Sequence, residues 1–369
     1  MIHIILGTKA QLIKMAPVMR ELEKRDAPYR FIFTGQHYQT IDWLLDNFGI
    51  REPDVFLNYK AIDVTGVMQM AKWLWHCWYE AKRREDEIFA PGDGWVLVHG
   101  DTISTLFGAA LGWRAGKMVA HVESGLRSFD YLNPFPEELV RMMAFRFSHL
   151  YFCPTNWAAD NLRHYKGEKI ITGGNTLMDS LRMVLKENLG PQPDIPQKPY
   201  GIVSVHRFEN IFQKAHLERI IRIMEFVARK YYLLFILHPP TEKKLKKFGF
   251  YGRLNDNPFI ELRPRHDYFS FIKLCRQSSF MMTDGGSNQE ESSYLGLPCL
   301  LLRRRTERQE GLGENVLLSK YSQEKIDAFF QSLDSFRRPP LLLNSSPSVC
   351  ICDFLLRQGE TCQRQTSSP

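Results

Sequence analysis

Short apolar runs alternate with longer amphipathic segments along most of the chain. The first apolar run, 3–6, is followed by a segment, 11–25, in which Leu12, Met15 and Met19 recur at helical spacing. This alternation is typical of βαβ units and predicts a mainly parallel sheet. Further strands are predicted at 29–34, 95–99, 118–122 and 150–153, and helices at 41–48, 64–89, 104–114 and from about 137.

A second series of the same kind follows a proline-rich segment, Gly190–Pro199, whose composition is typical of a stiff linker. Its strands are predicted at 201–205, 232–237, 259–262, 280–283 and 298–302. We therefore predict an α/β protein with two doubly wound, Rossmann-like parallel-sheet domains that face a cleft. The first domain is predicted over 1–185, the second over 197–340, and a frayed polar tail over 358–369.

Composition and charge exclude several classes of protein. Hydrophobic residues make up 44% and charged residues 24%, as in ordinary globular domains. No apolar run approaches the ~20 residues of a membrane helix, and no basic leader precedes the first run, so a cytoplasmic protein is expected. The 48 basic and 41 acidic residues give a net charge of +7, spread along the chain. That distribution fits a small anionic ligand better than a nucleic acid.

No metal site is predicted from the cysteines or the histidines. The seven cysteines include no C-x-x-C pair, and the eleven histidines include no H-E-x-x-H pattern. Scattered, reduced cysteines are the ordinary interpretation for this kind of chain.

Acidic residues follow strand ends in the first series. Asp101 comes just after 95–99, Glu123 follows 118–122, and Glu137 enters a helix. Because carboxyl ends of parallel strands meet at one edge, these acids are expected to converge. Converging carboxylates raise the pKa of at least one of them, which suits a proton donor. An N-cap role for Asp101, and a favourable helix-terminus position for Glu137, remain open alternatives.

The turn after the first strand, Gly7–Gln11, opens a helix whose free amides suit a phosphate, with Lys9 and Lys14 adding positive charge. An ordinary βα turn with solvated lysines is the alternative, because the G-x-G-x-x-G pattern is absent.

Two further turns belong to the second series. His206 and Arg207 end its first strand, and 283–291 passes from a strand through glycines into a helix that carries Glu291. The amides at this helix start form a second anion site, and Glu291 is placed to accept from ribose hydroxyls. The run 303–308 is either a solvated surface or a diphosphate clamp.

Nine ordered motifs span nearly the whole chain. They are GTKAQLIKMAP at 7–17, TGQH at 34–37, HGDT at 99–102, HVESGLR at 121–127, PFPEE at 134–138, GNT at 174–176, VHRFEN at 205–210, TDGGSNQEE at 283–291 and TER at 306–308. On these motifs the chain resembles the UDP-N-acetylglucosamine 2-epimerase family. The resemblance implies a GT-B architecture, with a last helix at 346–357 that crosses back to the first domain, and a homodimer.

The resemblance also implies a reaction. UDP leaves C1 while a proton is removed from C2, and UDP then adds back to the 2-acetamidoglucal with protonation from the other face. No cofactor and no metal take part. The matching catalytic positions are Asp101, Glu123, Glu137 and His206. The positions that match the binding site for the nucleotide sugar are Lys9, Lys14, Arg127, Arg207, Gly286, Ser287, Glu291 and Arg308. Parts of the family's regulatory site match Gln36, Gln39 and His238.

Several nucleotide-binding motifs depart from the usual family pattern. Lys9 stands where an arginine is usual, Ala10 and Gln11 replace a proline and a glutamate, and Gly285 replaces a serine. The acids and His206 are retained. We therefore expect an isomerase that interconverts UDP-GlcNAc and UDP-ManNAc or a close 2-acetamido analogue. A hydrolase releasing ManNAc and UDP, a GT-B glycosyltransferase and a nucleotide-sugar binder are the alternatives.

Overall fold

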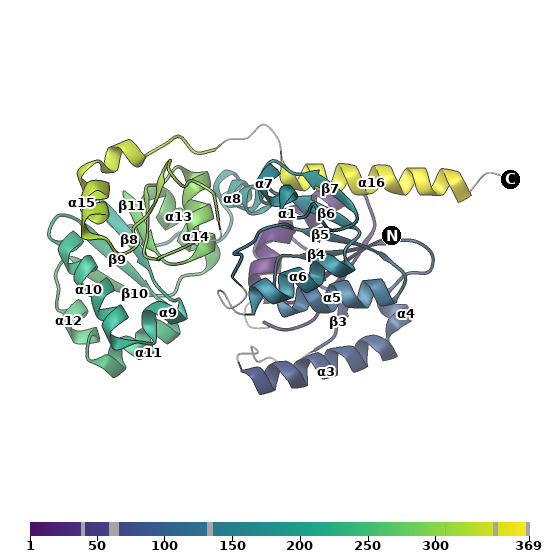
Figure 1. The fold of residues 1–369 in the computed structure, drawn as a ribbon, viewed down its shortest axis with the longest axis horizontal. Helices are drawn as coiled ribbons and strands as arrows, with labels where there is room; N and C mark the ends of the chain where they lie inside the picture. Colours follow the sequence, from purple (N-terminus) through teal and green to yellow (C-terminus); the bar gives the residue numbers. More distant parts are fainter. Residues whose placement is uncertain (38–40, 59–65, 131–135, 307, 342–345, 367–369) are drawn as a thin grey trace. The chain divides into compact units, whose positions relative to one another are not determined.

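The computed structural model describes residues 1–37, 41–58, 66–130, 136–306, 308–341 and 346–366. The chain divides into two compact units (Figure 1). Unit 1 comprises 1–183 with 343–369, and unit 2 comprises 184–342. All seven tryptophans of the sequence fall in unit 1, so tryptophan fluorescence reports on that unit alone.

Unit 1 contains a parallel sheet of seven described strands in the order β3-β2-β1-β4-β5-β6-β7. All five residues of β1 are buried, as expected for a strand covered by helices on both faces. The strands are β1 Ile2–Leu6, β2 Tyr29–Phe33, β3 Val55–Phe56, β4 Trp95–His99, β5 Met118–Val122, β6 Leu150–Cys153 and β7 Glu168–Ile171. The helices are α1 Lys9–Lys24, α2 Ile41–Phe48, α3 Val67–Arg83, α4 Glu85–Ile88, α5 Ile103–Arg114, α6 Glu137–Phe147, α7 Asn156–Asp160, α8 Leu177–Lys186, which runs into unit 2, and α16 Pro347–Thr366.

Unit 2 repeats this winding with six described strands in the order β10-β9-β8-β11-β12-β13. The strands are β8 Tyr200–Ser204, β9 Tyr232–Leu237, β10 Ile260–Pro264, β11 Phe280–Thr283, β12 Cys299–Leu301 and β13 Val316–Leu318. The helices are α9 Phe208–Ile211, α10 Lys214–Ala228, α11 Pro239–Phe248, α12 Tyr251–Asn255, α13 Tyr268–Gln277, α14 Gly286–Leu295 and α15 Gln323–Gln331, followed by the 3₁₀ helix η1 Leu333–Phe336.

The predicted fold class, α/β with two doubly wound parallel sheets, is confirmed. Sequence periodicity missed β3, β7 and β13, all of which lie at sheet edges and have two to four residues. The long helix expected over 64–89 is instead two helices, α3 and α4, because Arg84 leaves the helical conformation with φ −115° and ψ 28°. No helix in the described parts of the chain is both long and apolar enough to cross a bilayer.

The C-terminal helix α16 lies beside α1 in unit 1 (Figure 1). Asp353 accepts a hydrogen bond from Arg25 at 2.5 Å, and the Cys352 thiol lies 3.6 Å from the Val18 carbonyl. The helix continues to Thr366, into the segment expected to be a frayed tail. Residues 358–366 contain no proline, and their glutamines, arginine and glutamate are good helix formers.

The proline-rich segment Gly190–Pro199 is attached to unit 2. Lys273 donates hydrogen bonds to the carbonyls of Gly190 and Pro191, at 3.0 and 3.2 Å, and Arg263 donates to the carbonyl of Asp194 at 2.5 Å. Its backbone is therefore held by side chains of the second sheet and its helices.

Candidate active site

Each sheet has a switch point where the strand order reverses, between β1 and β4 in unit 1 and between β8 and β11 in unit 2. Ligands of doubly wound sheets bind at the carboxyl ends of the strands beside this point. Lys9 and Asp101 follow β1 and β4, and His206 and Asp284 follow β8 and β11. The topology therefore brings three predicted residues, Lys9, Asp101 and His206, to the expected edge of their sheets, together with Asp284, which was not predicted.

Glu123 lies at the carboxyl end of β5 in an unusual backbone conformation. Its φ is +61°, in the left-handed region that non-glycine residues rarely adopt and that is often found at functional sites. The carboxylate is buried and contacts the Lys14 ammonium, which donates to both oxygens at 2.7 and 2.9 Å. His99 Nε2 lies 3.2 Å from the Glu123 Oε2 atom. Lys14, predicted to bind substrate, thus forms an ion pair with one of the predicted catalytic acids.

Asp101 is paired with Arg141, a buried residue of α6 that sequence reasoning missed. The Arg141 guanidinium contacts Asp101 Oδ2 and donates to Glu138 Oε2 at 2.9 Å. Arg141 lies one helical turn after Glu137, so these two side chains share a face of α6. The start of α6 is thereby placed next to Asp101, with Glu137 half-buried at its first position.

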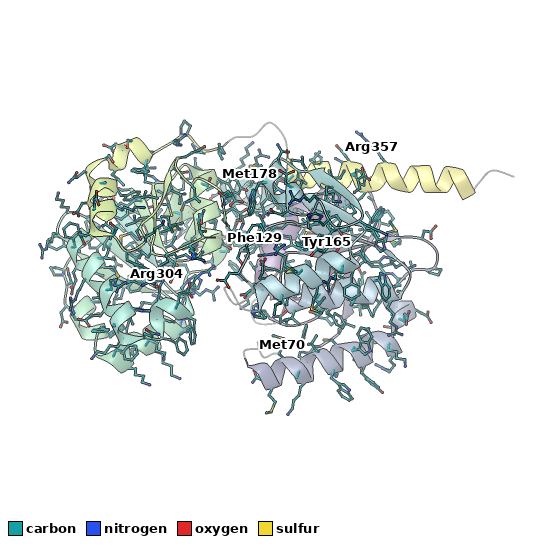
Figure 2. All side chains as sticks on the ribbon, viewed as in Figure 1. Met70, Phe129, Tyr165, Met178, Arg304 and Arg357 are labelled. Atoms are coloured by element: carbon teal, nitrogen blue, oxygen red, sulfur yellow. The ribbon has the colours of Figure 1, made fainter. Side chains whose placement is uncertain are left out.

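Glu138 is buried between two arginines, Arg127 and Arg141, and forms an ion pair with each of them. Burial raises the pKa of its carboxyl, but hydrogen bonds from Arg127 and from the Ser128 amide, together with nearby positive charge, bring the pKa below its ordinary value. Arg127, predicted to bind substrate, donates to Glu138 and also lies against the ring of Phe129, 5.0 Å from its centroid. Phe129, labelled in Figure 2, is exposed.

Gln11 ties the turn after β1 to the end of β4. Its side-chain oxygen accepts from the amides of Gly7 and Thr8 at 2.9 and 3.1 Å, and its amide group donates to the His99 carbonyl at 2.8 Å. The Thr8 hydroxyl completes a capping box with Gln11 at the start of α1. Lys9 is half-buried in the first turn of this helix.

His121, which lies in β5 two residues before Glu123, is fully buried. Its Nε2 atom lies 2.7 Å from the Gly100 carbonyl, and its Nδ1 atom lies 3.2 Å from the Ser124 hydroxyl. Burial lowers the pKa of His121 to about 4. The imidazole links the turn that precedes Asp101 with the turn that follows Glu123.

We expect this histidine to make unit 1 less stable in mild acid. The folded state keeps His121 neutral, whereas the unfolded chain takes up a proton below about pH 6.5, so stability is lost as the pH falls from 6.5 towards 4. The loss between pH 7 and pH 5 is about 2 kcal/mol from this group. Guanidinium unfolding followed by tryptophan fluorescence measures it. His121→Asn should lose less stability over the same interval, and equal losses in the two proteins would contradict the assignment.

In unit 2, His206 leaves the end of β8 and stacks on His238, with ring centroids 4.3 Å apart. His238, predicted as part of a regulatory site, lies 3.4 Å from the Ser204 hydroxyl through its Nε2 atom. Burial and the neighbouring His206 lower the pKa of His238 to about 3. Arg207 has its guanidinium 3.9 Å from Glu209.

The helix α14 carries the residues predicted for the nucleotide. Glu291 is buried and accepts from the Asn288 amide at 2.9 Å, while Ser287 is exposed near the start of the helix. Asn288 Oδ1 also accepts from the Thr283 hydroxyl at 3.0 Å. A Cβ atom at Gly285 would lie 2.7 Å from Asn288 Oδ1, so the usual serine does not fit there without displacing this amide. Gly286, the first residue of α14, is buried.

Arg308 approaches α14 from the loop after β12. Its guanidinium donates to Glu290 Oε2 at 2.6 Å, and Gln289 donates to the Arg308 carbonyl at 3.2 Å. Within the preceding arginine run, Arg303 is buried, whereas Arg304, labelled in Figure 2, is exposed. The run therefore contains both buried and exposed arginines.

The remaining predicted positions divide in two. Gln36 is buried, and its side-chain oxygen accepts from the Ser104 hydroxyl at 2.6 Å, whereas Gln39 lies outside the described residues. Across the described ranges, no group of three or more histidine, cysteine or acidic side chains is arranged to hold a metal ion.

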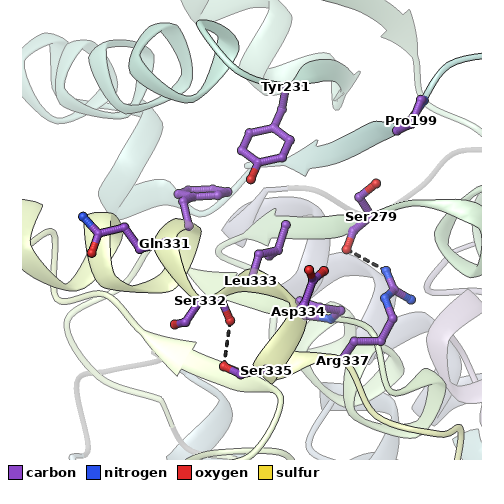
Figure 3. A pocket seen from close by; sticks show the side chains of 11 residues that line it. Pro199, Tyr231, Ser279, Gln331, Ser332, Leu333, Asp334, Ser335 and Arg337 are labelled. Carbon is purple, nitrogen blue, oxygen red and sulfur yellow. Dashed lines mark hydrogen bonds between the residues drawn. The ribbon is translucent and has the colours of Figure 1, made fainter.

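A separate pocket of unit 2, of about 490 Å³, is shown in Figure 3. Its lining includes Pro199, Tyr231, Ser279 and Pro298, each of which immediately precedes a strand. The pocket thus lies at the amino ends of the strands, the edge opposite to that of His206, and none of the predicted site residues lines it.

The residues that sequence reasoning missed are mostly partners of the predicted ones. The pair with the clearest local signal is Glu138 with Arg141, which lie three residues apart on α6 just after Glu137. His99 and Asp284 stand in the motifs HGDT and TDGGSNQEE, but their contacts join separate strands.

Comparison with known proteins gives a consistent result. The model of the family described as UDP-N-acetylglucosamine 2-epimerase matches residues 20–341. The UDP-N-acetylglucosamine 2-epimerase of Methanococcus maripaludis is 33% identical over 85% of this chain and 86% of that protein. The Methanocaldococcus jannaschii UDP-GlcNAc 2-epimerase, solved in complex with UDP-GlcNAc and UDP, is 29% identical with a TM-score of 0.81, over 96% of this chain and 99% of that one. The Neisseria meningitidis enzyme bound to UDP-GlcNAc is 25% identical with a TM-score of 0.79, over 96% of this chain and 99% of that one.

These matches cover both units and confirm the GT-B class of fold as well as the resemblance carried by the motifs. The family model alone spans most of the sequence. This chain therefore belongs to the UDP-N-acetylglucosamine 2-epimerase family.

Proposed function

We propose that this enzyme interconverts UDP-GlcNAc and UDP-ManNAc, or a close 2-acetamido analogue, without releasing the free sugar. The observation that carries the proposal is the pair of carboxylates at the switch-point edge of unit 1, Glu123 held by Lys14 and Asp101 held by Arg141. Relatives named for this reaction, with about the full length of this chain, support the substrate.

The proposed reaction needs one group to take the C2 proton and another to return it. In the forward direction a carboxylate removes the proton from C2, the C1–O bond breaks, and UDP departs with the bonding electron pair. The reverse steps add UDP to C1 and deliver a proton to the opposite face of C2. We assign the proton transfers to Glu123, Asp101 and Glu137, because oriented acid and base groups are what this chemistry requires.

The departing diphosphate needs positive charge. We assign it to Lys9 and Arg207, which follow β1 and β8 at the switch points, and to Arg308 beside α14. His206 is assigned to the leaving group and Glu291 to the ribose. Gly286 and Ser287 are assigned to the phosphates through the free amides of α14.

Incubation with UDP-GlcNAc in heavy water tests this function. We expect proton NMR to show deuterium at C2 of both epimers, with no accumulation of free UDP. Release of UDP with C2-labelled ManNAc would instead identify a hydrolase. Turnover that leaves C2 unlabelled would identify a glycosyltransferase, and no turnover would leave only nucleotide-sugar binding; each of these outcomes contradicts the proposal.

The resemblance also leads us to propose a homodimer, and the exposed aromatic side chains of α3 support it. Trp75 is 71% exposed and stacks on Tyr79, which is 55% exposed. Exposed apolar side chains that cluster in this way are typical of protein interfaces. Sedimentation equilibrium distinguishes one copy from two.

The cytoplasmic location stays a prediction.

A further inference from the structure

Asp284 is fully buried at the end of β11, beside the turn that carries His206. Its carboxylate accepts hydrogen bonds from the backbone amides of His206 and Arg207, each at 3.0 Å, and from the Asn210 side chain at 2.8 Å. All three donors come from one short segment, 206–210, that leaves the neighbouring strand β8. A buried carboxylate is tolerated only where such donors compensate for its lost hydration.

The contact with the imidazole itself is of another kind. His206 Nδ1 lies 3.5 Å from Asp284 Oδ1, which is longer than an ordinary hydrogen bond. Asp284 therefore acts on this ring through its negative charge and through the backbone that it holds. The ring also stacks on His238, with the two ring centroids 4.3 Å apart.

Asn210 is held in turn by residues of two other strands and loops. Its amide group also donates to the Leu302 carbonyl at 3.1 Å, and the Tyr321 hydroxyl lies within hydrogen-bond distance of Asn210 Oδ1 and 2.8 Å from the Leu302 carbonyl. These hydrogen bonds, from Tyr321 to Asn210 and from Asn210 to Asp284 and the Leu302 carbonyl, thus anchor the His206 turn to the end of β12.

We propose that Asp284 is a positioning residue that fixes the place and the charge state of His206, and that Asn210 and Tyr321 support it. The proposal rests on the proposed function, since it takes His206 as the group beside the departing UDP. Asp284 touches no reacting atom in this scheme.

The charge of Asp284 opposes the effect of burial on His206. Burial lowers the pKa of the imidazole below its ordinary value, and the Asp284 carboxylate raises it. Removal of this negative charge should therefore lower the pKa further and leave less imidazolium at neutral pH. The charged or titratable groups around the ring are Asp284, Arg207, Arg265, Glu209 and His238.

Asp284→Asn tests the proposal, because the amide keeps the size of the side chain but loses the charge and turns one oxygen into a donor. We expect turnover of UDP-GlcNAc to fall by about 10²-fold, mainly in kcat, as for a misplaced catalytic group. NMR of the labelled histidines should show a lower pKa for His206. In a His206→Ala background, Asp284→Asn should cause no further loss, since residues that act together are not additive.

Two outcomes would overturn the proposal. One is an Asp284→Asn loss that persists in full in the His206→Ala background. The other is an unchanged His206 pKa in Asp284→Asn protein whose unfolding, followed by far-ultraviolet circular dichroism, matches the wild type. If Asp284→Asn does not fold, Tyr321→Phe replaces it, with a smaller shift of the His206 signals expected and an absence of any shift contradicting the role. Absence of C2 exchange in the wild type would refute the proposed function, whereas the NMR measurement tests the positioning independently.

Discussion

Glu123→Gln is expected to lower turnover of UDP-GlcNAc by about 10²-fold or more, because it removes a proton-transfer group while keeping the shape of the side chain. The substitution also removes the negative partner of Lys14, whose ammonium contacts both Glu123 oxygens. The backbone at φ +61° costs a glutamine no more than a glutamate, so the fold should persist. The rate of deuterium entry at C2 measures the effect directly.

A matched control for this substitution is Glu168→Gln, which changes an exposed acid at the start of β7, away from the carboxyl ends of the strands. It should leave turnover unchanged. Asp101→Asn and Glu137→Gln should each show losses of about the same order as Glu123→Gln. Turnover near that of the wild type in all three variants would end the assignment of these acids to proton transfer.

Arg141→Met is expected to lower the free energy of unfolding of unit 1 by about 3 kcal/mol, because it leaves the buried Glu138 carboxylate with one cation fewer. It also removes the contact that holds Asp101, so turnover should fall together with stability. Guanidinium unfolding followed by tryptophan fluorescence isolates unit 1, since unit 2 contains no tryptophan.

Arg146→Met provides the comparison on the same helix, because Arg146 is exposed. A substitution at such a position should change stability by no more than about 0.5 kcal/mol. If the two methionine variants proved equally stable and equally active, the contacts of Arg141 with Glu138 and Asp101 would contribute neither to stability nor to turnover. That result would contradict the prediction.

Local patterns predicted most of the fold. Central strands such as β4 and β5 begin and end where the apolar runs do, because strands buried on both faces are continuous hydrophobic runs. The edge strands β3, β7 and β13 escaped notice, since short strands with partly exposed side chains leave no such run. Hydrophobic periodicity predicted one helix over 64–89, whereas the structure has two helices separated by Arg84.

The candidate site was predictable to the extent that strand ends are visible in sequence. Asp101 follows one predicted strand after a single glycine, and His206 directly follows another, so their place at the carboxyl edges follows from the topology of parallel sheets. Their partners were not predictable, because Arg141 lies 40 residues from Asp101, and Asp284 lies 78 residues from His206.

The amino-acid sequence by itself determined the alternation of strands and helices, the family, and which acids end which strands. Tertiary structure alone decided which charged side chains form ion pairs. Lys14, 109 residues before Glu123, pairs with that carboxylate, and Arg127 pairs with Glu138. The physical reason is that hydrophobic periodicity is a property of neighbouring residues, whereas an ion pair forms between side chains that only the packing of the sheet brings together.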